Sequence, residues 1–389
     1  MRVRLLLLMM MVASMAAGCA SMQPKRPEAA GASLDSEIRR LMAEHEVVGL
    51  ALAVVRSGEV TQVETFGYRN LERGLPLTPE TVLYGASLTK AAFGYMVLQL
   101  VDEGRLSLDT SIAALLPRPL PEYEDYGDIA GDDRWKALTP RILLTHSSGL
   151  ANFRWLEEDG RLQFHFEPGT RYGYSGEGFY ILQLVLEQGL GLDVGLEMQR
   201  RVFDRFAMSS TSMTWRPAFA ENLADGYGTD GTMEPHDERS SVSAAGSMDT
   251  TIADQAKLWA GIVRGEGLSP ASRAERVRPG LAITSLHQFP TLRPWSDPRN
   301  AEIGLSAGLG VVVFKDTSGP AWFKGGHNDW TGNMVVCLEA SQDCVVMMAN
   351  DVRAERIFPE VARLVLGETR MPWRWEYDWF ESSVPGRAR

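Results

Sequence analysis

Apolar, β-rich segments lie near both ends of the chain and are separated by a long stretch rich in helix and loop signals. Strands are predicted at 49–56 and 60–68, joined by a hairpin turn at Ser57-Gly58, and again at 307–314, 320–325, 332–338 and 343–349. Strands at both ends of a helical middle indicate one sheet built from distant segments. The predicted fold is therefore an α/β (α+β) domain with a mainly antiparallel sheet flanked by helices, plus an inserted all-helical domain.

Apolar residues at helical spacing predict the remaining elements. Helices are expected at 34–46, 87–102, 140–146, 176–189, 194–206, 251–263 and 353–366. We expect a discontinuous α/β domain made of 34–104 and 246–366, with a helical domain at 105–245 between the two parts. No internal repeat is evident.

An aromatic tail is predicted at 367–389, where Trp373, Trp375 and Trp379 lie close together. Such a tail either contacts a partner or membrane surface or packs over the core, and we favour packing.

The charge balance excludes some partners. The 389 residues include 39 Lys and Arg against 50 Asp and Glu, a net charge of −11. A surface this acidic argues against binding nucleic acid through phosphates, so no nucleic-acid partner is expected.

The N-terminus has the pattern of an export signal. Arg2 and Arg4 precede a short apolar run and a small-residue zone that ends at Cys19, which predicts a signal peptide over 1–18 and a tether over 19–33. The run Ala16-Ala-Gly-Cys19 resembles a bacterial lipobox, with Ala16 in place of the usual Leu. We expect an exported protein of the periplasm or cell envelope that is anchored through lipid on Cys19, with ordinary secretion as the alternative.

Two further cysteines, Cys337 and Cys344, occupy neighbouring apolar runs around a polar turn. A hairpin centred between Ala340 and Ser341 would place them directly opposite each other, within disulfide range. We predict a Cys337–Cys344 disulfide in an oxidising compartment, the alternative being two buried thiols. Neither cysteine has a histidine at ligand spacing, so no metal site is expected.

Ser87 and Lys90 form the sharpest local motif, Gly85-Ala-Ser-Leu-Thr-Lys90. Residues three apart share one helix face, and a helix N-terminus favours a developing anion beside Ser87. A serine needs a neighbouring base, and a partly buried lysine can serve as one whereas arginine cannot. Only six of the 39 basic residues are lysines, so a lysine at this position suggests that its titration matters.

Two other segments carry chemically useful residues. Tyr174 precedes a predicted helix and could shuttle a proton if nearby lysines depress its pKa, although alone it reads more simply as a structural aromatic. Lys324 ends an apolar strand and is followed by Gly325, Gly326 and His327. Such a strand edge could bind an acyl carbonyl and a carboxylate, or Lys324 could simply be a solvated strand-end charge.

Together these motifs resemble the serine β-lactamase and penicillin-binding-protein superfamily, in the branch of class C β-lactamases and related esterases and D-aminopeptidases. Ser87–Lys90, Tyr174 and Lys324-Gly-Gly follow that family's order. The connecting segments at 138–150, 167–170 and 243–249 are also similar to those of this branch.

The resemblance implies a β-lactamase/transpeptidase-like fold with a site between two lobes. Ser87 would be the acylated nucleophile, and Lys90 and Tyr174 would share general-base and general-acid duty. The backbone N–H groups of Ser87 and His327 would form the oxyanion hole. Lys324 would keep Tyr174 deprotonated and orient a substrate carboxylate. The family needs no metal or organic cofactor.

Two departures from the family pattern weaken the case for an efficient β-lactamase. Gly176 stands where the tyrosine motif of class C enzymes has Asn, with Glu177 as a partial replacement, and Gly325 lacks the hydroxyl usually found there. A Ser-His mechanism through His146 or His327 is disfavoured, because His146 lies in the structural loop at 138–150.

The sequence therefore predicts an exported serine hydrolase that acts on ester or amide substrates through an acyl-Ser87 intermediate. An esterase or D-amino-acid peptidase is favoured over a β-lactamase. The alternative is a catalytically weak envelope lipoprotein that uses the same cleft to bind peptidoglycan or a partner.

Overall fold

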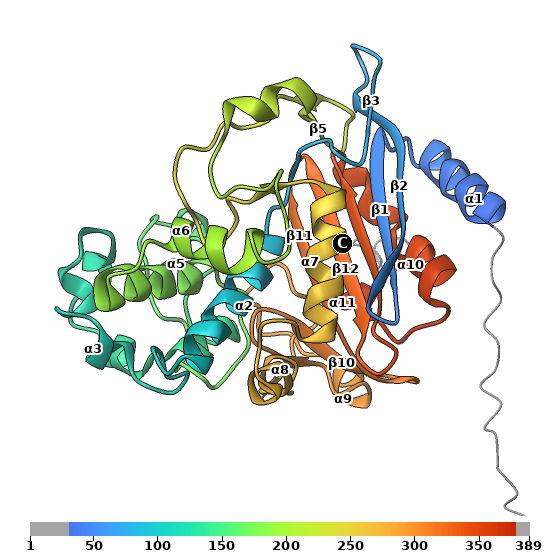
Figure 1. The fold of residues 1–389 in the computed structure, drawn as a ribbon. Helices are drawn as coiled ribbons and strands as arrows, with labels where there is room; N and C mark the ends of the chain where they lie inside the picture. Colours follow the sequence, from blue (N-terminus) through green and yellow to red (C-terminus); the bar gives the residue numbers. More distant parts are fainter. Residues whose placement is uncertain (1–30, 379–389) are drawn as a thin grey trace, which may run out of the picture.

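One antiparallel sheet joins the two ends of the chain. The computed structural model describes residues 31–378, so Cys19, Trp379, the signal peptide and most of the tether lie outside the described residues. The nine strands of the main sheet run in the order β3-β2-β1-β13-β12-β11-β10-β9-β8. β1 (Gly49–Arg56) pairs with β13 (Asp343–Ala349) and aligns Leu50 with Ala349, which confirms the predicted sheet of distant segments (Figure 1).

The strands near both termini match the predicted segments closely. The other strands are β2 (Glu59–Asn70), β3 (Leu75–Pro76), β4 (Leu83–Tyr84), β5 (Gly226–Tyr227), β6 (Met233–Glu234), β7 (Asp249–Thr250), β8 (Leu281–Ala282), β9 (Ser306–Ala307), β10 (Val312–Asp316), β11 (Gly319–Asn328) and β12 (Thr331–Leu338).

Eleven α-helices occur within the described residues. They are α1 (Gly31–Glu44), α2 (Leu88–Asp102), α3 (Ile112–Leu115), α4 (Pro140–Leu144), α5 (Gly176–Leu184), α6 (Val194–Met198), α7 (Ile252–Arg264), α8 (Pro270–Arg276), α9 (Arg299–Glu302), α10 (Phe358–Leu366) and α11 (Trp373–Glu376). One-turn π segments extend α5 and α6 over Val185–Gly189 and Gln199–Phe203.

Alternating side chains of the central strands pack into two different cores. Along β12, Val335 and Cys337 join the core that contains α2 and α7, whereas Val336 joins the core that contains α1 and α10. Both faces of the sheet are therefore covered by helices, with α7 against one face and α1 and α10 against the other (Figure 1). A strand buried on both faces reads as an unbroken apolar run, which is what Met334–Leu338 of β12 and Cys344–Ala349 of β13 show.

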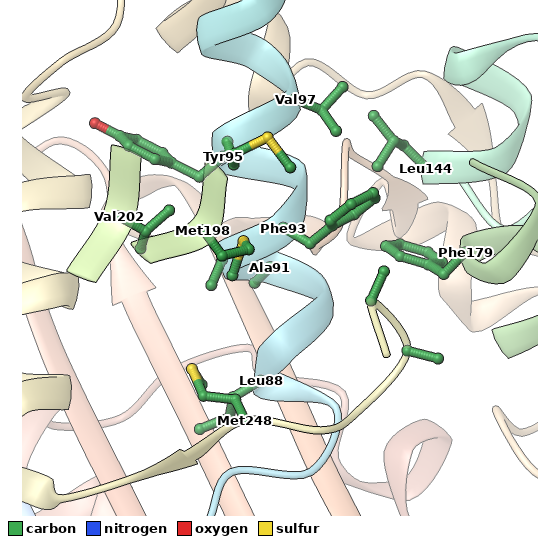
Figure 2. Close-up of a cluster of buried hydrophobic side chains, with 14 of the residues drawn as sticks. Leu88, Ala91, Phe93, Tyr95, Val97, Leu144, Phe179, Met198, Val202 and Met248 are labelled. Atoms are coloured by element: carbon green, nitrogen blue, oxygen red, sulfur yellow. The ribbon is translucent and has the colours of Figure 1, made fainter. Parts of the chain in front are cut away.

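Helix α2 runs through the middle of the first core. Nearly all its residues, from Leu88 to Leu100, are buried, as expected for a helix that is apolar on every side. Figure 2 shows Phe93 against Phe179 of α5, Leu88 near Met248, and Tyr95 on the side of Val202. This packing holds the N-terminal end of α2, and with it Ser87, in a fixed place.

Two predicted elements differ from the structure. The strand expected at 307–314 is divided into β9 and β10 by a turn at Gly308–Val311, in which Gly310 has φ +76°. A side chain at Gly310 would press on the carbonyl of Lys90, so the glycine allows this turn to pack against α2. The region 105–245, expected to be all-helical, also contains the short pair β5–β6.

The hairpin of β12 and β13 carries the predicted disulfide. Cys337 lies directly opposite Cys344, and the two are bonded with a Cα–Cα distance of 4.2 Å. The described part of the aromatic tail packs over the core, as expected: Trp375 is buried, and its indole donates to Ser285.

Within residues 31–378, no single helix is long and apolar enough to cross a membrane. Two helical segments taken together, Gly176–Gly189 and Val194–Phe203, are long and apolar enough, but they are bent by 103° relative to each other. This match rests on length and composition only.

Candidate active site

A cleft of about 610 Å³ opens where the start of α2 meets β11. Its walls contain Ser87, Tyr174 and the Lys324–His327 segment, so three separately predicted parts of the chain meet there. The lining also includes Tyr84, Asn152, Phe153, Trp155, Leu156, Arg239, Gln288, Phe289 and Glu376.

Ser87 and Lys90 are in direct contact at the head of α2. Ser87 is the residue that precedes the first turn, and Lys90 Nζ donates to Ser87 Oγ at 3.2 Å. Lys90 Nζ also donates to the carbonyl of Ala245 at 2.5 Å. These two contacts direct the side-chain nitrogen of Lys90 toward the serine hydroxyl, away from solvent.

Burial changes the acidity of Lys90. Its side chain has no exposed surface, and this burial lowers the pKa of Lys90 well below the ordinary lysine value, with the charge of Lys324 adding to the effect. No carboxylate compensates within hydrogen-bonding distance among the described residues. A lysine in this environment is suited to accept a proton from the serine hydroxyl.

Tyr174 and Lys324 complete the polar cluster. Lys324 Nζ donates to the Tyr174 hydroxyl at 3.2 Å and also contacts the carbonyl of Gly325. Tyr174 is also hydrogen-bonded to Ser87, and its ring lies 5.1 Å from Lys90 Nζ. The phenol therefore lies among Ser87, Lys90 and Lys324.

The environment of Tyr174 opposes the expectation that Lys324 keeps this residue deprotonated. Burial raises the pKa of Tyr174 above its ordinary value, and the hydrogen bond with Ser87 offsets this only in part. Burial also lowers the pKa of Lys324, against the attraction of Glu376. Desolvation thus favours the neutral phenol of Tyr174, which is better suited to donate a proton than to remove one.

The glycine pair after Lys324 allows β11 to touch the start of α2. A Cβ at Gly326 would lie 2.9 Å from the backbone nitrogens of both Ser87 and Leu88, closer than any side chain tolerates. The backbone that leads into His327 therefore runs directly beside Ser87, where oxyanion donors would be needed. The His327 ring itself points to Glu355, with Nδ1 3.0 Å from Oε1.

The structure explains Gly176 and corrects the expectation for Glu177. A Cβ at Gly176 would lie 2.4 Å from the Phe153 ring, so no side chain fits there. Glu177 is buried and turns away from the cleft to bind Arg154. Nη2 of Arg154 lies 3.2 Å from Oε2 of Glu177. Because this ion pair engages its carboxylate, Glu177 does not replace the missing asparagine.

Several cleft residues were not predicted from the sequence. Asn152 Oδ1 accepts from the Gly176 N–H at 3.0 Å, which leaves its amide nitrogen at the cleft wall. Arg239 lies 3.8 Å over the Tyr84 ring and donates to Asp249 at 3.1 Å. Neither residue belongs to a recognisable motif, and only the folding of their loops brings them to the site.

An aromatic rim borders the opening. Phe153 and Trp155 stack with ring centroids 4.2 Å apart, and Trp155 and the adjacent Leu156 are each 63% exposed. Exposed apolar side chains that gather at a cleft indicate a binding surface.

His146 has a structural position, as expected. It is buried, its ring stacks on Tyr174 at 4.1 Å, and its Nδ1 accepts from the Ser175 N–H at 3.1 Å. Burial lowers the pKa of His146 far below its usual value, and Lys90 and Lys324 reinforce this. Within residues 31–378, no group of three or more His, Cys, Asp or Glu side chains is placed to hold a metal ion.

Two solved structures illustrate the likeness of the fold. A class C β-lactamase superposes with a TM-score of 0.69 at 16% identity, covering 91% of this chain and 96% of the other. The D-alanine carboxypeptidase AmpC from Burkholderia cenocepacia gives a TM-score of 0.67 at 19% identity, covering 86% and 97%. At these identities the likeness shows the fold alone.

Curated proteins match over shorter stretches. A D-aminopeptidase of Gluconobacter oxydans (strain 621H) is 27% identical over 214 residues, which is 52% of this chain and 39% of that protein. Esterase EstB of Burkholderia gladioli is 33% identical over 127 residues, 33% of this chain and 30% of the esterase. The chain thus spans only about a third of the length of these relatives.

The family described as Beta-lactamase, in contrast, matches residues 34–368, nearly the whole described part. The chain belongs to the Beta-lactamase family.

Proposed function

We propose that this protein is a serine hydrolase that cleaves esters or amides through an acyl-Ser87 intermediate. The observation that carries the proposal is the contact between Ser87 Oγ and Nζ of the fully buried Lys90 at 3.2 Å. Family membership and the esterase and D-aminopeptidase relatives agree with hydrolase chemistry.

The proposed reaction has two steps. Neutral Lys90 accepts the hydroxyl proton as Ser87 Oγ bonds to the substrate carbonyl carbon, and the oxyanion forms beside the backbone of Ser87 and His327. Collapse breaks the bond to the leaving alcohol or amine, which takes a proton from Tyr174 or from the newly charged Lys90. Water then attacks the acyl-serine and releases the acid, which restores Ser87.

An ester substrate with an apolar group is favoured over a β-lactam. The aromatic rim of Phe153, Trp155 and Leu156 offers apolar contact at the opening. Phe153 closes the space beside Gly176. These contacts support an esterase or a peptidase for apolar substrates.

A turnover panel tests the proposal. The purified mature chain is assayed with p-nitrophenyl esters, D-amino-acid p-nitroanilides and a chromogenic cephalosporin, with Ser87→Ala as the matched variant. We expect ester or anilide hydrolysis that Ser87→Ala abolishes, and weak or no cephalosporin hydrolysis. Equal activity in Ser87→Ala would reject the mechanism. Binding to peptidoglycan with no turnover of any substrate would favour the catalytically weak envelope protein.

We also propose that the protein is exported and lipid-anchored at Cys19. The support is the signal-like N-terminus with its lipobox-like end. A hydrolase of the cell envelope would meet its acyl substrates outside the cytoplasm.

A further inference from the structure

An acidic side chain from the C-terminal segment lies inside the cleft. Glu376, the last residue of α11, is only 4% exposed and lines the same cavity as Ser87 and Lys324. It lies beyond residues 34–368, the part of the chain that the family matches. The cleft therefore contains a charge contributed by a segment that is additional to the matched family region.

The Glu376 carboxylate is held in place by a chain of neutral groups. Gln288 Nε2 donates to Glu376 Oε2 at 2.8 Å, and Gln288 Oε1 accepts from the Tyr172 hydroxyl at 2.9 Å. The backbone N–H of Gln288 donates to the carbonyl of Trp375. This bond joins the segment that carries Gln288 to the segment that carries Glu376. Gln288 therefore orients the carboxylate through a hydrogen bond and brings no charge of its own.

The other carboxylate oxygen lies against Gly325. A Cβ built at Gly325 would be 2.1 Å from Glu376 Oε1, so the carboxylate fills the space that a side chain would take. A Cβ built at Gly326, the next residue, would lie 2.9 Å from the backbone nitrogen of Ser87. Because Glu376 and Ser87 line the same cavity, the carboxylate lies within reach of a group attached to the acyl chain on Ser87.

The other charged groups in the cleft are paired or otherwise engaged. Arg239 binds Asp249 at 3.1 Å, and His327 binds Glu355 at 3.0 Å, both carboxylates being outside the cavity lining. Lys324 donates to Tyr174 and Gly325, and its charge also attracts Glu376. Burial raises the pKa of Glu376 to about 7, and the charges of Lys324 and His327 oppose this rise. Above that pH, Glu376 is the buried anion that an acyl group would meet beside β11.

We propose that Glu376 is a specificity-determining residue, which selects acyl groups bearing a cation such as an ammonium and rejects those bearing a carboxylate. The inference deepens the proposed function and rests on acylation at Ser87. A substrate carboxylate would be placed beside a like charge in a site largely removed from water, where screening is weak. A substrate cation would gain an opposite charge there, and an uncharged acyl group would be intermediate.

The test compares three phenyl esters of similar size in wild type and in Glu376→Gln. Phenyl hexanoate is neutral, phenyl trimethylammoniobutyrate is cationic and monophenyl adipate is anionic, and spontaneous hydrolysis is subtracted. Glutamine keeps the shape and removes the charge. We expect Glu376→Gln to lower the ratio of cationic to neutral kcat/KM about tenfold and to raise the ratio of anionic to neutral about tenfold.

The control is Glu368→Gln, which removes the same charge from a side chain that is 85% exposed on the same segment. Both ratios should match those of the wild type within twofold. Unchanged ratios in Glu376→Gln would overturn the inference while leaving the proposed function intact. If the wild type did not hydrolyse the neutral ester, the proposed function itself would be overturned.

A second variant covers the case in which Glu376→Gln does not fold. Gly325→Ala places a methyl group where Oε1 lies and displaces the carboxylate without removing its charge from the chain. Both ratios should move in the same directions as in Glu376→Gln. Wild-type ratios in folded Gly325→Ala would count against the inference.

Discussion

Lys90 is the residue on which the proposed chemistry depends most. Its ammonium is buried, contacts Ser87 and has Lys324 as a like-charged neighbour. The sequence identified Ser87 and Lys90 correctly as neighbours, because a spacing of three places two side chains on one helix face. It did not predict that the pKa of Tyr174 is raised, because this shift comes mainly from burial, which is a property of the folded cleft.

Lys90→Arg separates charge from basicity. Arginine keeps the positive charge but does not release its proton, so kcat should fall by a factor of about 10² to 10⁴. Steady-state hydrolysis of a neutral ester measures the loss. The exposed Lys315, changed to Arg, is the matched control and should keep wild-type activity. A Lys90→Arg enzyme that folds and retains full activity would exclude Lys90 as the base.

The pH profile should follow the titration of Lys90. Only the neutral amine accepts a proton, so kcat/KM should rise with pH through the pKa of Lys90, which burial lowers. The charge of Lys324 lowers that pKa further, so Lys324→Met should raise the pKa of Lys90 and move the rising limb to higher pH. A limb that stays in place or moves to lower pH would contradict this coupling.

At the scale of elements, the apolar runs predicted β1, β12, β13 and α2 almost to the residue. Shorter elements were missed because turns decide them: β9 and β10 are divided at Gly308–Val311, where the chain packs against α2. The loops that supply Asn152, Gln288 and Arg239 to the cleft have no periodicity to read. Their positions depend on tertiary contacts, such as the hydrogen bond between Gln288 and Glu376.

The junction of β11 with α2 should be intolerant of any side chain. In Gly326→Ala the new methyl group would meet the backbone nitrogens of Ser87 and Leu88, and backbone cannot move aside as a side chain can. We expect a loss of about 1–3 kcal/mol in the free energy of unfolding together with slower acylation of Ser87. Thermal unfolding and ester hydrolysis measure both. Gly127→Ala is the control, because a methyl group there meets open space.

The disulfide should stabilise the β12–β13 hairpin. It closes a short loop with a sequence separation of 7, so replacing both Cys337 and Cys344 with Ala should cost about 2 kcal/mol of unfolding free energy. Denaturant unfolding of the double variant under oxidising conditions measures this cost. Wild type and double variant with equal midpoints would show that the bond is not formed in solution.

At the scale of the whole molecule, the fold places a rigid sheet edge opposite a set of loops, and the catalytic candidates come from both sides. Ser87 and Lys90 belong to α2, Lys324 to β11, and Tyr174 to the segment before α5. The order of these motifs made the family recognisable from the sequence. The contribution of α11 was not foreseeable, since a tail rich in tryptophan indicates packing and gives no sign that Glu376 enters the cleft.

Localisation is also a property of the whole chain. If Cys19 carries lipid, the full-length protein expressed in a bacterial host should fractionate with membranes, and Cys19→Ala should move it to the soluble fraction. Mass spectrometry of the mature N-terminus identifies the acyl groups. Wild-type protein recovered in the soluble periplasmic fraction, without lipid, would favour ordinary secretion.

The most direct test of the central claim is intact-mass spectrometry of the mature protein after exposure to a fluorophosphonate. An activated serine loses its hydroxyl proton, displaces fluoride and keeps the phosphonyl group, so the account predicts one adduct on wild type and none on Ser87→Ala. No adduct on folded wild type, or an equal adduct on Ser87→Ala, would contradict the assignment of Ser87 as the nucleophile.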